Sequence, residues 1–328
     1  MRKTVFAVLL SALFISVAVA GDSYRNPTSA ARPDVVSPGP IVVYPFVDVG
    51  AIQATSTKIF VSDVVDNVVN IYNTSGKQLA QLTGFSEPQG LATDAKGNLY
   101  VADTLNSRIQ IYAPPYTKKP KTLSDPGQYP CGVSVLNNGE FVAVTNIIST
   151  SYGAGSVTIY KKNKAGKAIS SSSFAKVYFA GFDANGDLYI DGSNSSGDVV
   201  VGEIAKATTT GKKIVTLTTR NLIEFPGGIE VTIKGKIAID DQEAASVYTY
   251  NAPKKGSLGS PVNTTALTGS GDPVTFAFTS TNKDLWTADA LNVELLEFAY
   301  PKGGSALKTI PVMGVEPAGV AVVPAEVP

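Results

Sequence analysis

A short pattern that recurs six times constrains the fold of this chain more than any other feature of its sequence. The clearest copy, residues 90–112, reads GLATDAKGNLYVADTLNSRIQIY: an alternating apolar strand, a turn, a second apolar strand, a polar turn and a third strand. With Asp103 as the reference, the same place in the other copies is held by Asp63, Thr145, Gly192, Asp241 and Asp289. The copies follow one another at about 40 to 50 residues, a period typical of repeat architectures.

Each copy predicts four short antiparallel strands. The third strand ends in an aromatic residue nine places after the reference in four copies, at Tyr72, Tyr112, Tyr250 and Phe298, and a weaker fourth strand follows. No stretch shows the period of an amphipathic helix. Six such units predict an all-β fold, a six-bladed β-propeller of four-stranded antiparallel blades.

The C-terminal stretch EPAGVAVVP predicts how the ring closes. It repeats the Pro-x-Gly segment and the first strand of a unit, so we expect residues 319–323 to become the inner strand of the N-terminal blade. The alternative is the stretch GAIQATS, which begins at Gly50 and aligns with the same first-strand position.

The N-terminal segment predicts export. Two positive charges precede an apolar stretch that ends in Ala18-Val19-Ala20, which fits the cleavage rule for signal peptides. A membrane anchor is disfavoured because the stretch is shorter than the roughly 20 residues that a spanning helix needs. We expect a signal peptide in residues 1–20, an extended leader in 21–49 and the propeller in 50–328. The mature chain would be a monomer without a membrane span, secreted or otherwise periplasmic or extracellular.

Composition excludes several classes of function. Lys plus Arg equals Asp plus Glu at 27 each, which gives no basic field for nucleic acid. The chain has no histidine, so Ser-His-Asp, Cys-His and histidine-metal mechanisms are excluded. The one cysteine, Cys131, precludes an internal disulfide and is interpreted as a small buried packing residue.

The stretch PQGLATDAKGNLYVADTLNSRIQIY, residues 88–112, resembles the consensus of the NHL-repeat family. The resemblance implies a six-bladed propeller but no single activity. The family is distantly similar to the gluconolactonase and regucalcin group, calcium-dependent lactonases that hold the metal over the central channel. Those proteins open with a Glu-Gly-Pro motif, which this chain lacks at the corresponding place.

Four aspartates recur at the end of the second strand and have two interpretations. As a partial ring of carboxylates, Asp63, Asp103, Asp241 and Asp289 are candidate ligands for a cation such as calcium. As framework residues, they accept N–H groups of their own tight loops, which explains why they recur blade after blade. Arg108 has no counterpart in the other copies, so it either pairs with Asp103 or faces a ligand.

Departures from the repeat point to a binding surface in the third and fourth blades. The segment TNIISTSYGAGS lengthens one loop by six residues, and GSNSSGD is polar and flexible. Loops on a rigid scaffold are where binding usually resides. We therefore expect Asn146, Tyr152, Ser193 and Asn194 to line a binding surface.

These observations favour a non-catalytic propeller that binds an extracytoplasmic protein or a glycan and needs no cofactor. The alternative is a calcium-dependent hydrolase of lactones or esters. Whether the chain is an enzyme is left open by the sequence, and no catalytic residue is predicted.

Overall fold

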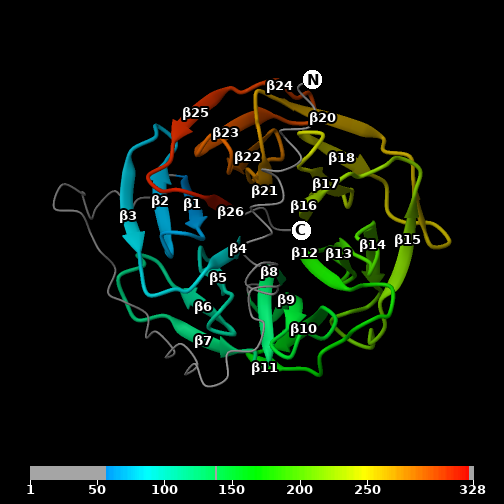
Figure 1. Cartoon of the computed structure of the whole chain (residues 1–328). Helices are drawn as coiled ribbons and strands as arrows, with labels where there is room; N and C mark the ends of the chain where they lie inside the picture. The colour runs from blue at the N-terminus through cyan, green and yellow to red at the C-terminus, as the bar shows by residue number, and fades with distance from the viewer. Residues whose placement is uncertain (1–56, 137–138, 325–328) are drawn as a thin grey trace. The chain divides into compact units, whose positions relative to one another are not determined.

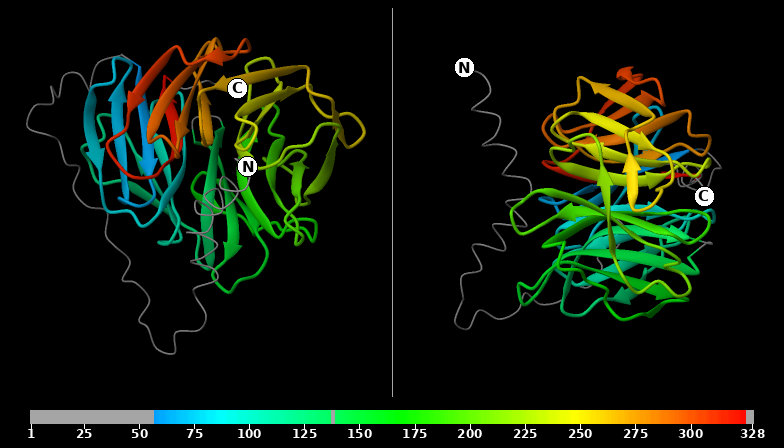
Figure 2. Two further views of the ribbon diagram at one scale, coloured as in Figure 1. Left: turned by 45° about the horizontal axis from the view of Figure 1, so that its top comes forward. Right: turned by 90° about the vertical axis from the view of Figure 1, so that its right-hand side faces the viewer.

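The computed structural model describes residues 57–136 and 139–324. The expected signal peptide and leader, and the alternative closing stretch that begins at Gly50, lie outside the described residues. Throughout the described part the chain forms strands, turns and loops, and it contains no helix of the length and hydrophobicity that a membrane span requires. Figure 2 shows the same strands and loops from two further sides.

Six sheets surround a central channel and confirm the predicted six-bladed β-propeller (Figure 1). The first three blades, each given from the channel outwards, are β26 (Pro317–Val323), β1 (Lys58–Asp63), β2 (Val68–Asn73) and β3 (Gln78–Leu82) in blade 1; β4 (Pro88–Thr93), β5 (Leu99–Asp103), β6 (Arg108–Tyr112) and β7 (Lys121–Ser124) in blade 2; and β8 (Gln128–Leu136), β9 (Phe141–Ser149), β10 (Ser156–Lys161) and β11 (Lys164–Ala165) in blade 3. The other three are β12 (Lys176–Phe182), β13 (Leu188–Ser193), β14 (Val199–Ile204) and β15 (Val215–Thr219) in blade 4; β16 (Pro226–Val231), β17 (Ile237–Asp241), β18 (Ser246–Tyr250) and β20 (Asn263–Thr268) in blade 5; and β21 (Pro273–Phe278), β22 (Asp284–Asp289), β23 (Glu294–Ala299) and β25 (Lys308–Pro311) in blade 6.

Two blades have a fifth strand that the repeat did not predict. β19 (Ser257–Gly259) pairs in parallel with the outer strand of blade 4, and β24 (Gly304–Ser305) pairs in parallel with the outer strand of blade 5. Each added strand comes from the blade that follows in the sequence. The two pairings therefore join neighbouring blades at the outer rim.

The C-terminal strand closes the ring as predicted. β26 pairs antiparallel with β1 and takes the inner position of blade 1, with Phe60 opposite Ala321. Figure 1 shows β26 beside the channel, between β21 and β4. The first and last parts of the propeller therefore share one sheet, which joins the two ends of the ring.

The core lies between the blades. The predicted aromatic ends of the third strands are buried: Tyr72, Tyr112, Tyr250 and Phe298 are each at most 1% exposed. Val320 of β26 packs with Ile59, Val61 and Trp286 in one cluster, which joins blade 1 to blade 6. The alternating pattern of the strands thus has a physical cause, since each sheet packs against a neighbour on both faces.

We predict that Val320→Ala lowers the free energy of unfolding by about 2 kcal/mol, because it removes two buried methyl groups from the closing strand. The matched control is Val315→Ala, just before the same strand, where the side chain is 53% exposed. The control should change stability by less than about 0.5 kcal/mol. Urea unfolding measures both, and equal losses would show that β26 does not close the ring.

Candidate functional site

In each of four blades, one aspartate accepts backbone N–H groups from the segment that leads into the inner strand. We call these four residues the aspartate clasp: Asp63, Asp103, Asp241 and Asp289. Asp63 accepts the backbone N–H groups of Val65 (3.0 Å) and Asp66 (2.8 Å) in its own loop. It also accepts those of Val315 (2.6 Å) and Glu316 (2.9 Å), in the segment that leads into the inner strand of the same blade. The other members bind the corresponding segments, Asp103 at Ser86 N (2.7 Å), Asp241 at Glu224 N (3.0 Å) and Phe225 N (3.2 Å), and Asp289 at Gly271 N (2.7 Å) and Asp272 N (3.2 Å). These bonds account for the recurrence of the carboxylate as a framework feature.

Arg108 is held inside blade 2 rather than on its surface. Its Nε lies 2.6 Å from Oδ2 of Asp103, and its Nη2 donates to the carbonyl of Gly84 at 3.1 Å. The side chain is 8% exposed. Of the two alternatives that the sequence left open, the local pair with Asp103 is the one observed.

The four residues expected to line a binding surface lie in different environments. Asn146 is buried in β9, and Ser193 is buried in β13, where its hydroxyl lies 3.2 Å from that of Tyr178. Tyr152 is 49% exposed at a turn. Asn194 is half-buried and accepts the N–H groups of Ser196 and Asp198 within its own turn. Of the four, Tyr152 is the one that the structure places largely in solvent.

The strand register of blade 3 corrects the sequence alignment that placed Thr145 at the position of Asp103. Pro130 lies opposite Asn146, as Pro88 lies opposite Asp103, so Asn146 and not Thr145 occupies the clasp position. The prediction was wrong by one residue because the span from Pro130 to its partner Asn146 is one residue longer than the span from Pro88 to Asp103. Blade 3 therefore carries an amide where the regular blades carry a carboxylate.

A second group of acids lies at the channel, and the sequence analysis did not find it. Glu316, Glu87 and Asp272 directly precede the proline that begins the inner strands of blades 1, 2 and 6, which are neighbours in the ring. We call these three residues the carboxylate mouth. The sequence signal was an acid before proline in three copies. The same position holds Tyr129, Lys176 and Phe225 in blades 3, 4 and 5.

The carboxylate mouth is electrostatically strained. Burial raises the pKa of Glu316 to about 7, and the negative charges of Asp63, Glu87 and Asp272 add to the effect. Burial also raises the pKa of Glu87 to about 7 and, with Asp289 and Glu243, that of Asp272 to about 6. One oxygen of each mouth residue is buried without a hydrogen-bond partner among the described residues. Perturbed carboxylates of this kind are typical of functional sites.

Two further acids, Asp191 in blade 4 and Asp240 in blade 5, are fully buried. They stand one residue before the reference position, where blades 1 and 3 have the hydroxyl residues Ser62 and Thr145. The Ser62 hydroxyl accepts Gly319 N (2.7 Å) from its own inner strand and donates to the carbonyl of Gln89 in the next blade (2.6 Å). Asp191 reproduces the first of these bonds, accepting Phe179 N at 2.9 Å.

Asp240 makes neither bond, and both of its carboxylate oxygens lack a partner within the described part of the chain. Burial and then the charges of Asp241, Asp272 and Asp191 raise its pKa well above the ordinary value. Burial likewise raises the pKa of Asp191. Asp240 is thus a fully buried acid whose charge is unfavourable beside that of Asp272 of the mouth.

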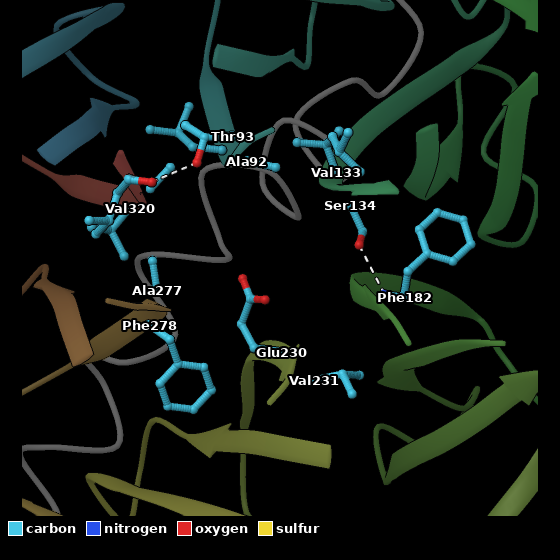
Figure 3. Close-up of a pocket in the computed structure, with 14 residues that line it drawn as sticks. Ala92, Thr93, Val133, Ser134, Phe182, Glu230, Val231, Ala277, Phe278 and Val320 are labelled. Carbon is cyan, nitrogen blue, oxygen red and sulfur yellow. Dashed lines mark hydrogen bonds between the residues drawn. The ribbon is translucent and has the colours of Figure 1, made fainter. Parts of the chain in front are cut away.

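At the opposite end of the channel, residues from all six inner strands line a pocket (Figure 3). Thr93 donates its hydroxyl to the carbonyl of Val322 (2.7 Å), and Phe182 N donates to the hydroxyl of Ser134 (3.0 Å). The carboxylate of Glu230 points toward the centre of the view.

Cys131 confirms the prediction of a buried packing residue. It is a free thiol, 0% exposed, and donates to Oε1 of Gln89 at 3.0 Å. Burial raises its pKa. Across residues 57–136 and 139–324, no group of three or more His, Cys, Asp or Glu side chains is arranged to hold a metal ion.

The clasp generates a first prediction. Asp63→Asn should lower the free energy of unfolding by about 2 to 4 kcal/mol, because four N–H groups converge on two carboxylate oxygens and an amide can accept at one side only. Asp66→Asn, at an exposed position of the same loop, is the control and should change stability by less than about 0.5 kcal/mol. Chemical denaturation at pH 7 compares them, and a neutral effect of Asp63→Asn would contradict the clasp.

Asp240 generates a second prediction. A folded-state pKa above the unfolded value means that the folded protein binds more protons, so stability falls as pH rises above the ordinary carboxyl pKa of about 4. Asp240→Asn should remove this loss. We expect the variant to be at least about 1 kcal/mol more stable than the parent at pH 8 and to lose this advantage near pH 4. Denaturation across this pH range tests it, and a constant difference would show that Asp240 is ionised at no energetic cost.

Comparison with known proteins agrees with this architecture. A family model for the NHL repeat matches residues 85–112, and no curated protein matches the chain. A chain from a nidogen/laminin complex superposes with a TM-score of 0.63 at 13% identity, covering 81% of this chain and 98% of that one.

Two bacterial structures are similar in the same way. A protein of unknown function from Bacteroides caccae has a TM-score of 0.62 at 11% identity, covering 81% of this chain and 98% of its own. A catalytically inactive virginiamycin B lyase from Staphylococcus aureus, crystallised with quinupristin, has a TM-score of 0.55 at 13% identity, covering 89% and 90%. At these identities the likeness concerns the fold. The protein is therefore a six-bladed β-propeller that contains an NHL repeat in residues 85–112.

Proposed function

We propose that the protein is a non-catalytic propeller that binds a partner protein outside the cytoplasm, through the face of the ring where the inner strands begin. The observation that carries the proposal is the carboxylate mouth, whose buried oxygens lack partners among the described residues. Such groups are costly to keep in a folded protein, and they become favourable when a ligand supplies the missing donors.

Several features support binding rather than catalysis. The similar virginiamycin B lyase is a catalytically inactive variant in which a histidine is replaced by alanine, and the present chain has no histidine. NHL propellers commonly bind proteins, which favours a protein over a glycan as the partner. The signal-peptide pattern of residues 1–20 supports a location outside the cytoplasm.

The test is a capture experiment with three immobilised proteins: the parent, the double variant Asp272→Asn/Glu316→Gln, and the control Glu140→Gln. Glu140 lies in the hairpin between β8 and β9, at the opposite end of the inner strands, and its side chain is 39% exposed. Partner proteins from the extracytoplasmic fraction of the host should bind the parent and the control, and binding to the double variant should fall by about tenfold or more. Quantitative mass spectrometry measures the captured proteins.

Equal capture by all three proteins would overturn the proposal. The competing function, a calcium-dependent hydrolase, predicts a different result in the same preparation. Calcium at 100 times its dissociation constant would stabilise the protein by about 2.7 kcal/mol. A rise in melting temperature of that size, together with hydrolysis of a lactone or ester, would favour the hydrolase.

A further inference from the structure

We propose that the group taken up by the carboxylate mouth is an alkyl ammonium or guanidinium, presented by a lysine or arginine side chain of the partner. This inference rests on the proposed function, because it names the chemistry of a ligand for the same face. It assigns Glu87, Asp272 and Glu316 as the residues that contact the cation.

The first argument is an uncompensated negative charge. Each mouth residue has a buried oxygen without a hydrogen-bond partner among the described residues, and the ion pairs found in that part of the chain involve other carboxylates. Independently of the mouth, Asp240 is 0% exposed, has two unpartnered oxygens and interacts electrostatically with Asp272. Burying several carboxylates without a counter-charge is unfavourable, and a cation between them reverses the sign of the interaction.

The second argument is that the three acids lie on separate strands, so the ligand group must offer several hydrogen-bond donors. Its three acids come from three neighbouring blades, each at the start of an inner strand. An ammonium group has three N–H donors and a guanidinium has five, so one side chain can serve carboxylates on separate strands. Blade 1 lies between blades 6 and 2 in the ring, so Glu316 stands at the middle position of the three, and the charges of Glu87 and Asp272 both act on it.

The third argument is the composition of the other half of the rim. Tyr129 and Phe225 occupy the position of the mouth acids in blades 3 and 5, and the rings of Phe225 and Tyr178 lie 6.2 Å apart. Aromatic surface suits the alkyl stem of a basic side chain and attracts its charge. Lys176 stands at this position in blade 4 and repels a cation from that side, so the charge is directed toward blades 6, 1 and 2.

Cation binding is coupled to proton release. The pKa of Glu87 and of Glu316 is about 7, so both are largely protonated at pH 6 and largely ionised at pH 8. Their acidic neighbours are Asp63, Asp272 and, facing Asp272, Asp289 and Glu243. A cation favours the ionised form, so affinity should rise with pH over this range, by about tenfold for each carboxylate that must lose a proton.

The probes for the test are Nα-acetyl-lysine amide and Nα-acetyl-arginine amide, with Nα-acetyl-norleucine amide as the uncharged control of similar shape. Calorimetric titration of the protein at pH 6 and pH 8 measures binding and, in buffers of different ionisation enthalpy, the protons released. We expect both cations to bind at pH 8, to bind more weakly at pH 6, and norleucine not to bind. Asp272→Asn and Glu316→Gln should each weaken binding by about tenfold, and Glu140→Gln should have no effect.

Two results would overturn the inference. One is equal binding of lysine and norleucine probes, and the other is unchanged affinity in both mouth variants while circular dichroism shows that they are folded. Calcium chloride is titrated alone in parallel. Calcium binding at the mouth that excludes the probes would also overturn the inference. If the probes do not bind but capture of the partner still requires Asp272 and Glu316, the inference about the cation is wrong. The proposed function then stands, with a different ligand group.

Discussion

The ring depends on a hydrogen-bond arrangement in which an aspartate accepts N–H groups from two segments distant in sequence. In blade 1 the two segments are the loop after Asp63 and the stretch before β26, about 250 residues later. A carboxylate suits this role because its two oxygens can accept several donors at once and need no proton of their own. The clasp thereby fixes where the inner strand begins in blades 1, 2, 5 and 6, and the inner strands form the wall of the channel.

Because the clasp holds the segment before the inner strand in blades 1, 2, 5 and 6, it also positions the residue that precedes the proline in those blades. That residue lies where the inner strand begins, whatever its chemistry. Blades 6, 1 and 2 carry acids there, and the opposite half carries two aromatic residues and a lysine. A regular framework thus supports an irregular rim, and the irregular positions are the ones open to functional interpretation.

The buried acids show the same contrast inside the blades. Ser62 and Thr145 join neighbouring inner strands through one hydroxyl, which both accepts and donates. An ionised carboxylate at this position can accept but cannot donate. Asp191 keeps the accepting bond, from Phe179 N, and Asp240 makes neither bond. Natural proteins break local rules mainly at functional or strained sites, and two such exceptions in the neighbouring blades 4 and 5 fit that expectation.

The sequence by itself determined the six units, their four strands, the buried aromatic ends and the closure by the C-terminal strand. These features follow from alternation and period, which are local properties of the chain. The tertiary structure decided which polar residues meet. Asn146 and Ser193 were expected in a binding surface but lie inside their sheets, because strand length and register are set by pairing with neighbours. Glu87, Asp272 and Glu316 are far apart in the sequence, and only closure of the ring brings their charges together.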